Sequence, residues 1–169
     1  MKKVLLLLTL IAAAFSAAQA QRAKSVLLAG EAAGQLAKQC SRPSPADYID
    51  TWTPTKEQIA EMEAKFADIA KLKVKSCCIE GAKVANPDEW YMQYAPLVWQ
   101  NKKVIYISGI STTEPPAATC FDYDSGGMTK AACDWKKRAI VICDGGKSWG
   151  VIYDVESRKF TDLTVNGVG

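Results

Sequence analysis

The stretch of residues 138–167, RAIVICDGGKSWGVIYDVESRKFTDLTVNG, decides the fold of this chain. It contains three runs rich in β-branched and aromatic residues: AIVIC, SWGVIYDV and KFTDLTV. Short polar stretches at residues 144–147 and 156–158 separate these runs, which is the spacing of strands joined by hairpin turns. We therefore predict an antiparallel meander here, on which the upstream segments pack.

A second hairpin is predicted upstream of the meander. The run YMQYAPLVW, which begins at Tyr91, leads through Gln100, Asn101 and Lys102 into KVIYISGI. Both runs are typical of strands, and Pro96 restricts the first of them to a sheet edge because proline has no backbone N–H to donate.

One amphipathic helix is predicted over residues 55–72, and either Thr53 or Thr55 can cap its start. Its apolar side chains recur every three or four positions, as on the buried face of a helix. These residues are Ile59, Met62, Phe66 and Ile69. The predicted fold class is therefore α+β: an antiparallel four- or five-stranded meander with one helix packed across one face.

The first 20 residues have the three-part pattern of a secretory signal peptide. Two lysines precede an apolar run over residues 4–15, and Ala18 and Ala20 fit the small-x-small cleavage rule. The apolar run is shorter than the ~20 residues that span a bilayer. We predict cleavage after Ala20, a periplasmic or secreted location, and no integral membrane anchor.

The predicted mature chain is nearly neutral and of single-domain size. Cleavage leaves 19 of the 21 basic residues against 18 acidic ones, a net charge of +1. That balance argues against a nucleic-acid partner, which needs concentrated positive charge. Removing 20 of the 169 residues leaves 149, which suits one domain. We predict a single domain over residues 40–169, preceded by a mobile or helical arm over residues 21–39.

All six cysteines follow the predicted cleavage site. They are Cys40, Cys77, Cys78, Cys120, Cys133 and Cys143. An even number in an oxidising compartment predicts three disulfides, for which fifteen pairings are formally possible. Zinc is disfavoured because the sequence has no histidine and no C-x-x-C pair, and we predict neither a metal site nor a cofactor. A bridge between the adjacent Cys77 and Cys78 would be strained, so each is expected to pair with a distant partner.

The composition also limits the catalytic chemistry. Without histidine, the Ser-His-Asp and Cys-His nucleophile arrangements and histidine general bases are excluded. A pair of carboxylates such as Asp144 and Asp154 could support acid–base hydrolysis. Both residues lie in a turn or at a strand end, however, where aspartates more often stabilise the backbone.

Residues 111–137, STTEPPAATCFDYDSGGMTKAACDWKK, form a long irregular insertion. Loops of this length in a compact domain tend to be functional or disordered, and Cys120 and Cys133 are expected to fix this one. It carries acidic and aromatic side chains suited to contacting a partner. These candidate binding residues are Glu114, Tyr123, Asp124 and Trp135.

Several short motifs resemble those of an uncharacterised family of small secreted bacterial proteins. They are Cys-Ser-Arg at 40–42, Trp-Thr-Pro-Thr at 52–55, Cys-Asp-Gly-Gly at 143–146, Trp-Gly-Val-x-Tyr-Asp at 149–154 and Asn-Gly at 166–167. The resemblance implies a bacterial source but no activity and no functional residues. It covers most of the mature chain, but neither residues 111–137 nor the cysteines at 77, 78, 120 and 133.

The resemblance, together with the grouping of the other four cysteines in the middle of the chain, leads us to expect a bridge from Cys40 to Cys143. Cys77 and Cys78 would then pair with Cys120 and Cys133, in an order that stays open. We predict an exported, disulfide-stabilised binding protein, such as an inhibitor or an immunity-type protein, with another envelope or secreted protein as its partner. The alternative is a carboxylate-dependent hydrolase of envelope polymers, which needs two acids in a cleft and one raised pKa.

Overall fold

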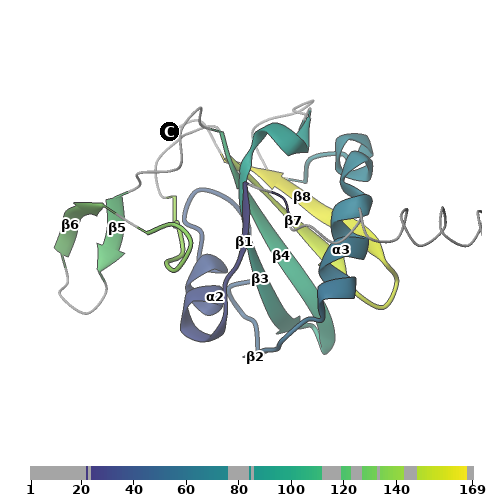
Figure 1. The fold of residues 1–169 in the computed structure, drawn as a ribbon, viewed down its shortest axis with the longest axis horizontal. Coiled ribbons are helices and arrows are strands. Elements are labelled where there is room, and N and C mark those ends of the chain that lie inside the picture. Colours follow the sequence, from purple (N-terminus) through teal and green to yellow (C-terminus); the bar gives the residue numbers. More distant parts are fainter. Residues whose placement is uncertain are drawn as a thin grey trace, which may run out of the picture.

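The computed structural model describes residues 22, 24–75, 84, 86–111, 119–122, 127–132, 134–142 and 148–166. These residues form an α+β fold in which a mixed, mostly antiparallel sheet lies between helical layers (Figure 1). The α+β class predicted from the sequence is confirmed, although several elements differ from the prediction.

The main sheet has six strands, in the order β1-β3-β4-β7-β8, with β2 also paired to β3. The strands are β1 (Ser25–Leu27), β2 (Asp50–Thr51), β3 (Tyr91–Trp99), β4 (Lys102–Ile110), β7 (Ser148–Asp154) and β8 (Lys159–Val165). All neighbours are antiparallel except β1 and β3, which are parallel. A separate antiparallel pair, β5 (Thr119–Asp122) and β6 (Gly127–Ala132), lies within the segment predicted to be an irregular insertion.

The predicted β3–β4 hairpin is confirmed, and a two-residue turn connects its strands. Trp99 pairs with Lys102, so only Gln100 and Asn101 connect the strands. Both residues have positive φ, 50° and 60°, as in the two-residue hairpin turns that match the twist of the flanking strands.

The prediction that Pro96 places β3 at an edge is wrong. On the side of β3 away from β4, β1 pairs up to Tyr94 and β2 pairs from Leu97. Pro96 lies between these two short strands, and its carbonyl accepts a hydrogen bond from the Trp52 amide on that side, at 3.3 Å. The proline nitrogen, which has no hydrogen to donate, therefore faces the gap in the pairing.

The C-terminal meander is only partly as predicted. Strands β7 and β8 form the expected hairpin, but the described residues 139–142 of the run AIVIC are not a strand. Two glutamine side chains bind this segment instead: Gln93 Oε1 accepts from the Ile140 amide at 2.7 Å, and Gln39 Oε1 accepts from the Ile142 amide at 3.1 Å. The second antiparallel neighbour of β7, on the side away from β8, is therefore β4 and not the run AIVIC.

The N-terminal segment packs into the domain. Residues 21–39 include β1, paired with β3, and the short helix α2 (Gly30–Leu36). Leu36 is fully buried, and α2 ends shortly before Cys40.

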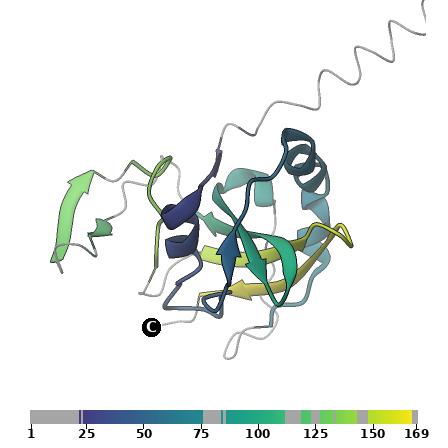
Figure 2. The same ribbon diagram turned by 90° about the horizontal axis from the view of Figure 1, so that it is seen from below.

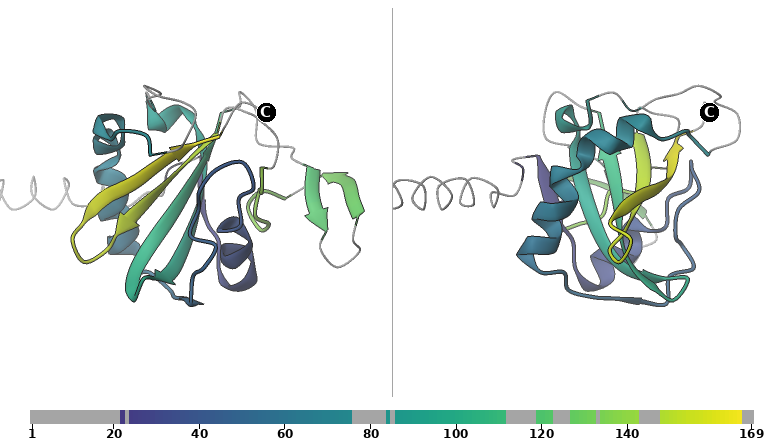
Figure 3. Two further views of the ribbon diagram at one scale, coloured as in Figure 1. Left: turned by 180° about the vertical axis from the view of Figure 1, so that it is seen from behind. Right: turned by 90° about the vertical axis from the view of Figure 1, so that its right-hand side faces the viewer.

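The sheet is covered by a helix on each face, whereas the sequence predicted a helix across one face only. Helix α3 (Lys56–Ala64) and the 3₁₀ helix η1 (Phe66–Lys71) cover one face of the sheet, while α2 lies against the other (Figures 1 and 3). The view from below shows the strands between these layers (Figure 2). A further 3₁₀ turn, η2 (Pro87–Glu89), precedes β3.

The predicted helix over residues 55–72 has the right start and the right buried face, but it is interrupted. Thr55 caps α3 in a capping box with Gln58. At Lys65 the backbone leaves helical geometry, with φ −101° and ψ 7°, and η1 follows. The four apolar residues predicted to face the core are all buried: Ile59, Met62, Phe66 and Ile69.

In the described part of the chain, no helix has the length and apolar character needed to cross a membrane. The predicted signal peptide, residues 1–20, lies outside the described residues.

Candidate functional site

Arg42 is a buried cation on the α2 face of the sheet, with only 5% of its surface exposed. Its Nε donates to the Tyr106 hydroxyl at 3.1 Å and its Nη2 donates to Ser108 Oγ at 2.7 Å. Nη1 donates to Ser148 Oγ at 2.8 Å and to Asn166 Oδ1 at 2.5 Å. All four partners are neutral, and no carboxylate of the described residues forms an ion pair with Arg42. The guanidinium charge is thus solvated by dipoles alone.

The local fold explains why Arg42 reaches this position. Tyr106 and Ser108 are two residues apart on β4, so their side chains leave the same face of the sheet. Gly150 on the neighbouring strand β7 has no side chain, and Tyr106 and Arg42 occupy the space above it. A Cβ there would lie 2.5 Å from the Tyr106 hydroxyl and 2.9 Å from Arg42 Nε. Glycine at position 150 is therefore required by the packing of Arg42 and Tyr106.

The segment after Arg42 forms a small loop, Pro43, Ser44 and Pro45, which is fixed on both sides. Thr164 Oγ1 on β8 donates to the Pro43 carbonyl at 3.1 Å. Ser44 Oγ donates to the carbonyl of Ala37, just after α2, at 2.6 Å. The loop is therefore tied to the sheet and to the end of α2.

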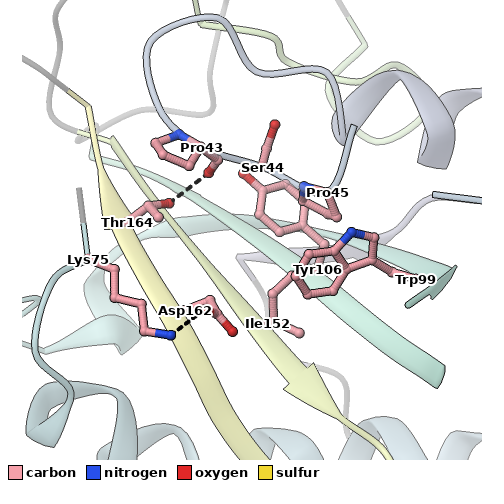
Figure 4. Close-up of a pocket in the computed structure, with 9 residues that line it drawn as sticks. All are labelled: Pro43, Ser44, Pro45, Lys75, Trp99, Tyr106, Ile152, Asp162 and Thr164. Carbon is pink, nitrogen blue, oxygen red and sulfur yellow. Dashed lines mark hydrogen bonds and ion pairs between the residues drawn. The ribbon is translucent and has the colours of Figure 1, made fainter. Parts of the chain in front are cut away.

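Between this loop and the sheet lies a pocket of about 270 Å³ (Figure 4). We call it the proline-loop pocket; it is lined by Pro43, Ser44, Pro45, Lys75, Trp99, Tyr106, Ile152, Asp162 and Thr164. Prolines, rings and Ile152 supply most of its wall, and charged groups lie at one end. Such a mixture of apolar walls and a few polar groups is typical of small-ligand sites.

The charged end of the pocket is an ion pair. Lys75 Nζ lies 2.6 Å from Asp162 Oδ1, and the two side chains are 67% and 35% exposed. Burial alone would raise the pKa of Asp162, but hydrogen bonds from Lys75 and Thr161 hold it below its ordinary value. Asp162 also has a positive φ of 53°, next to the irregularity in the β7–β8 register.

Tyr106 lines the pocket on the side next to Arg42. Its ring is buried, and this burial raises the pKa of its hydroxyl above the ordinary value. The positive charge of Arg42 and its hydrogen bond act in the opposite direction. The tyrosine is thus neutral at physiological pH, with a cation one hydrogen bond behind it.

Of the four residues predicted to bind a partner, only Trp135 lies within the described residues. It is 7% exposed, and its ring packs edge-on against Tyr91 at 5.3 Å between centroids. Its carbonyl accepts from Gln93 Nε2 at 2.6 Å. The tryptophan side chain is thus covered in this structure, and its part in binding stays a prediction. Glu114, Tyr123 and Asp124 lie outside the described residues.

Asp154, one of the two acids considered for hydrolysis, stabilises a turn. Its Oδ1 accepts from the Ser157 amide at 2.8 Å, and its Oδ2 lies 3.0 Å from Lys102 Nζ. The Ser157 amide and then Lys102 hold the pKa of Asp154 below its ordinary value, against the effect of burial. This is the opposite of what a general acid needs. Asp144 lies outside the described residues.

Of the two cysteines of the predicted Cys40–Cys143 bridge, only Cys40 lies within the described residues. Cys40 is disulfide-bonded, and the next residue, Ser41, hydrogen bonds through its amide to the Ile142 carbonyl at 3.2 Å. This contact brings the neighbours of Cys40 and Cys143 together. Cys143 itself lies outside the described residues, so the Cys40–Cys143 pairing and the other two bridges stay predictions. Among the described residues, no group of histidine, cysteine or acidic side chains could hold a metal ion.

Comparison with known proteins gives no guide to this site. The chain matches no protein-family model, no curated protein and no solved structure.

Sequence reasoning did not identify the proline-loop pocket. The signals present were an arginine between a cysteine and two prolines and a glycine in the middle of a strand, Gly150. An unusual glycine in a strand often marks a close approach of other groups. Its partners, Tyr106 and Arg42, are separated from each other by 64 residues, and sequence spacing alone could not bring them together.

Proposed function

We propose that this chain is an exported binding protein rather than an enzyme, and that the proline-loop pocket holds a small organic ligand with an apolar body. The observation that carries this proposal is the pocket itself: apolar walls formed by Trp99, Tyr106 and Ile152, closed by a loop that is fixed on both sides. A preformed site of this kind binds without first having to order the chain.

The volume of the pocket limits the ligand. Pockets for drug-sized molecules usually measure about 300–1,000 Å³, and this one measures about 270 Å³. It therefore suits one aromatic ring or a short aliphatic group, with the rest of a larger molecule in solvent.

The residues that line the pocket favour binding over catalysis. Its hydroxyls and charges already serve structural contacts: Ser44 Oγ donates to Ala37, and Lys75 and Asp162 are paired with each other. The lining hydroxyls of Ser44, Tyr106 and Thr164 are hydrogen bonded to backbone carbonyls or to Arg42, and none is bonded to a general base, as an activated hydroxyl nucleophile requires. The low pKa of Asp154 likewise gives no support to the hydrolase alternative.

Ligand-observed NMR and tryptophan fluorescence test this proposal on the exported, oxidised protein. The probes are phenylacetate, its amide phenylacetamide and 2-phenylethylamine, which share one ring and differ in charge. We expect at least one to bind, and Trp99→Ala to abolish that binding because it removes a pocket wall.

The matched control is Ile49→Ala, which removes a 67% exposed apolar side chain that does not line the pocket. Binding should survive this change. Failure of the wild-type protein to bind any probe, or equal loss in both variants, would overturn the proposed site.

A further inference from the structure

We infer that the ligand of the proline-loop pocket is an apolar carboxylic acid, with its carboxylate at the Lys75 end. This inference rests on the proposed function and adds the charge of the ligand.

Two cations and one anion act on the pocket wall. Lys75 and Asp162 line it and form an ion pair, so their charges nearly cancel. Arg42 lies behind Tyr106, one 3.1 Å hydrogen bond away from that lining residue. Since all described partners of Arg42 are neutral, its charge adds to the field in the pocket. That field is screened less by protein than by water.

Tyr106 lies between Arg42 and the pocket. Its hydroxyl oxygen accepts the hydrogen bond from Arg42, which leaves the hydroxyl proton to be donated. The hydroxyl lies against Arg42 and Gly150. Arg42 therefore acts on a ligand anion at the Lys75 end through its field, not through a direct hydrogen bond.

The Lys75–Asp162 pair can also exchange partners. Both side chains are partly or largely exposed, and exposed ion pairs contribute only about 0–1 kcal/mol. A ligand carboxylate can therefore take over Lys75 at little cost. The other nearby carboxylate, Asp47, accepts from the Trp99 indole at 2.7 Å. It is exposed and does not line the pocket, so solvent screens its charge.

The test measures the affinities of the same three probes by calorimetry. We expect phenylacetate to bind about two- to fivefold more tightly than phenylacetamide, the range that a single exposed ion pair supplies. 2-Phenylethylamine should bind most weakly. Lys75→Gln should remove the preference for phenylacetate, and Asp162→Asn should strengthen phenylacetate binding because Lys75 loses its competing partner.

A matched ion pair on the opposite side of the sheet provides the control. Lys71 and Asp68 on η1 are also 2.6 Å apart and exposed, so Lys71→Gln and Asp68→Asn should leave all three affinities unchanged. Tyr106→Phe keeps the ring but removes the hydroxyl. Because the carboxylate is placed at Lys75, this variant should keep the preference for phenylacetate over phenylacetamide.

The outcomes separate this inference from the proposed function. If the three probes bound with equal affinity, and Trp99→Ala abolished all three, the inference that the ligand is a carboxylic acid would be contradicted. The proposal that the pocket binds a ligand would stand. A preference for the amine would assign recognition to Asp162 and contradict the inference. Absence of binding by all three probes would overturn the proposed function together with the inference.

Discussion

The two faces of the main sheet are built from alternate residues of the same strands, yet they are stabilised in different ways. Under α3 and η1, hydrocarbon and aromatic side chains pack together, with Phe66 edge-on to Tyr94 at 6.2 Å. Two polar atoms on that face, Trp149 Nε1 and Tyr153 Oη, are buried with no hydrogen-bond partner among the described residues. The opposite face, which we call the loop-covered face, is covered by α2 and by the loops of residues 43–45 and 138–142. There Gln39 and Gln93 donate to carbonyls of the irregular backbone, and Arg42 donates to side chains such as Ser148.

This difference indicates where a ligand site can form. The side chains of α3 and η1 pack directly onto their face of the sheet. A loop such as residues 43–45 has fewer side chains to offer and is held at a few points, which leaves the proline-loop pocket beside it. Stability on the first face depends on buried area, and on the second it depends on particular hydrogen bonds.

The largest expected effect tests the helix-covered face. Phe66→Ala removes a ring that is 2% exposed and packs against Tyr94 and Phe160. We expect the free energy of unfolding to fall by about 3–5 kcal/mol, measured by urea denaturation. A loss below about 1 kcal/mol, as expected for an exposed side chain such as Ile49, would contradict this packing.

The next largest effect tests the loop-covered face. Arg42→Gln removes most of the hydrogen bonds to Tyr106, Ser108 and Ser148 and leaves buried hydroxyls unpaired. We expect a loss of about 2–4 kcal/mol, with faster hydrogen exchange over residues 41–45. Arg158→Gln is the control, because that side chain is 64% exposed. A comparable loss in the control would remove the contrast between the two arginines.

Gln93 gives a smaller effect that is confined to one segment. Its side chain donates to the carbonyls of Trp135 and Arg138 and accepts from the Ile140 amide, all at 2.6–2.7 Å. Gln93→Leu should cost about 1–3 kcal/mol and should increase exchange at the Ile140 amide. Unchanged exchange there would show that the segment does not depend on Gln93.

The smallest effect is the pH dependence contributed by Asp154. Its folded-state pKa lies below the ordinary value of 3.8, so the folded protein favours the ionised form. This stabilisation is complete above about pH 4 and is lost as the pH falls through the folded-state pKa. Asp154→Asn should therefore be less stable than the wild type by about 1 kcal/mol at pH 7. A difference that does not shrink in urea denaturation at low pH would contradict the assignment.

The contrast between the faces also explains how much the sequence could predict. The apolar spacing of Ile59, Met62, Phe66 and Ile69 identified the helix-covered face, because burial on a helix has a short sequence period. The strands β3, β4, β7 and β8 were likewise recognisable from β-branched and aromatic runs with turn residues between them.

The loop-covered face had no such period. The run AIVIC has the composition of a strand, but Gln39 and Gln93 bind its backbone from positions about 100 and 50 residues away in sequence. The contact of Arg42 with Asn166 spans 124 residues. Hydrogen bonds of this kind join residues that come together only in the folded chain, so a single sequence gives no local sign of them.

The central claim is that the loop-covered face carries the ligand site, and an NMR titration of the ¹⁵N-labelled oxidised protein with phenylacetate tests it most directly. We predict shifts of the Trp99 indole N–H and of the Ile152 and Thr164 amides, with the Ile59 and Phe66 amides unchanged. Shifts confined to α3 and η1, or to the β5–β6 pair, would contradict the claim.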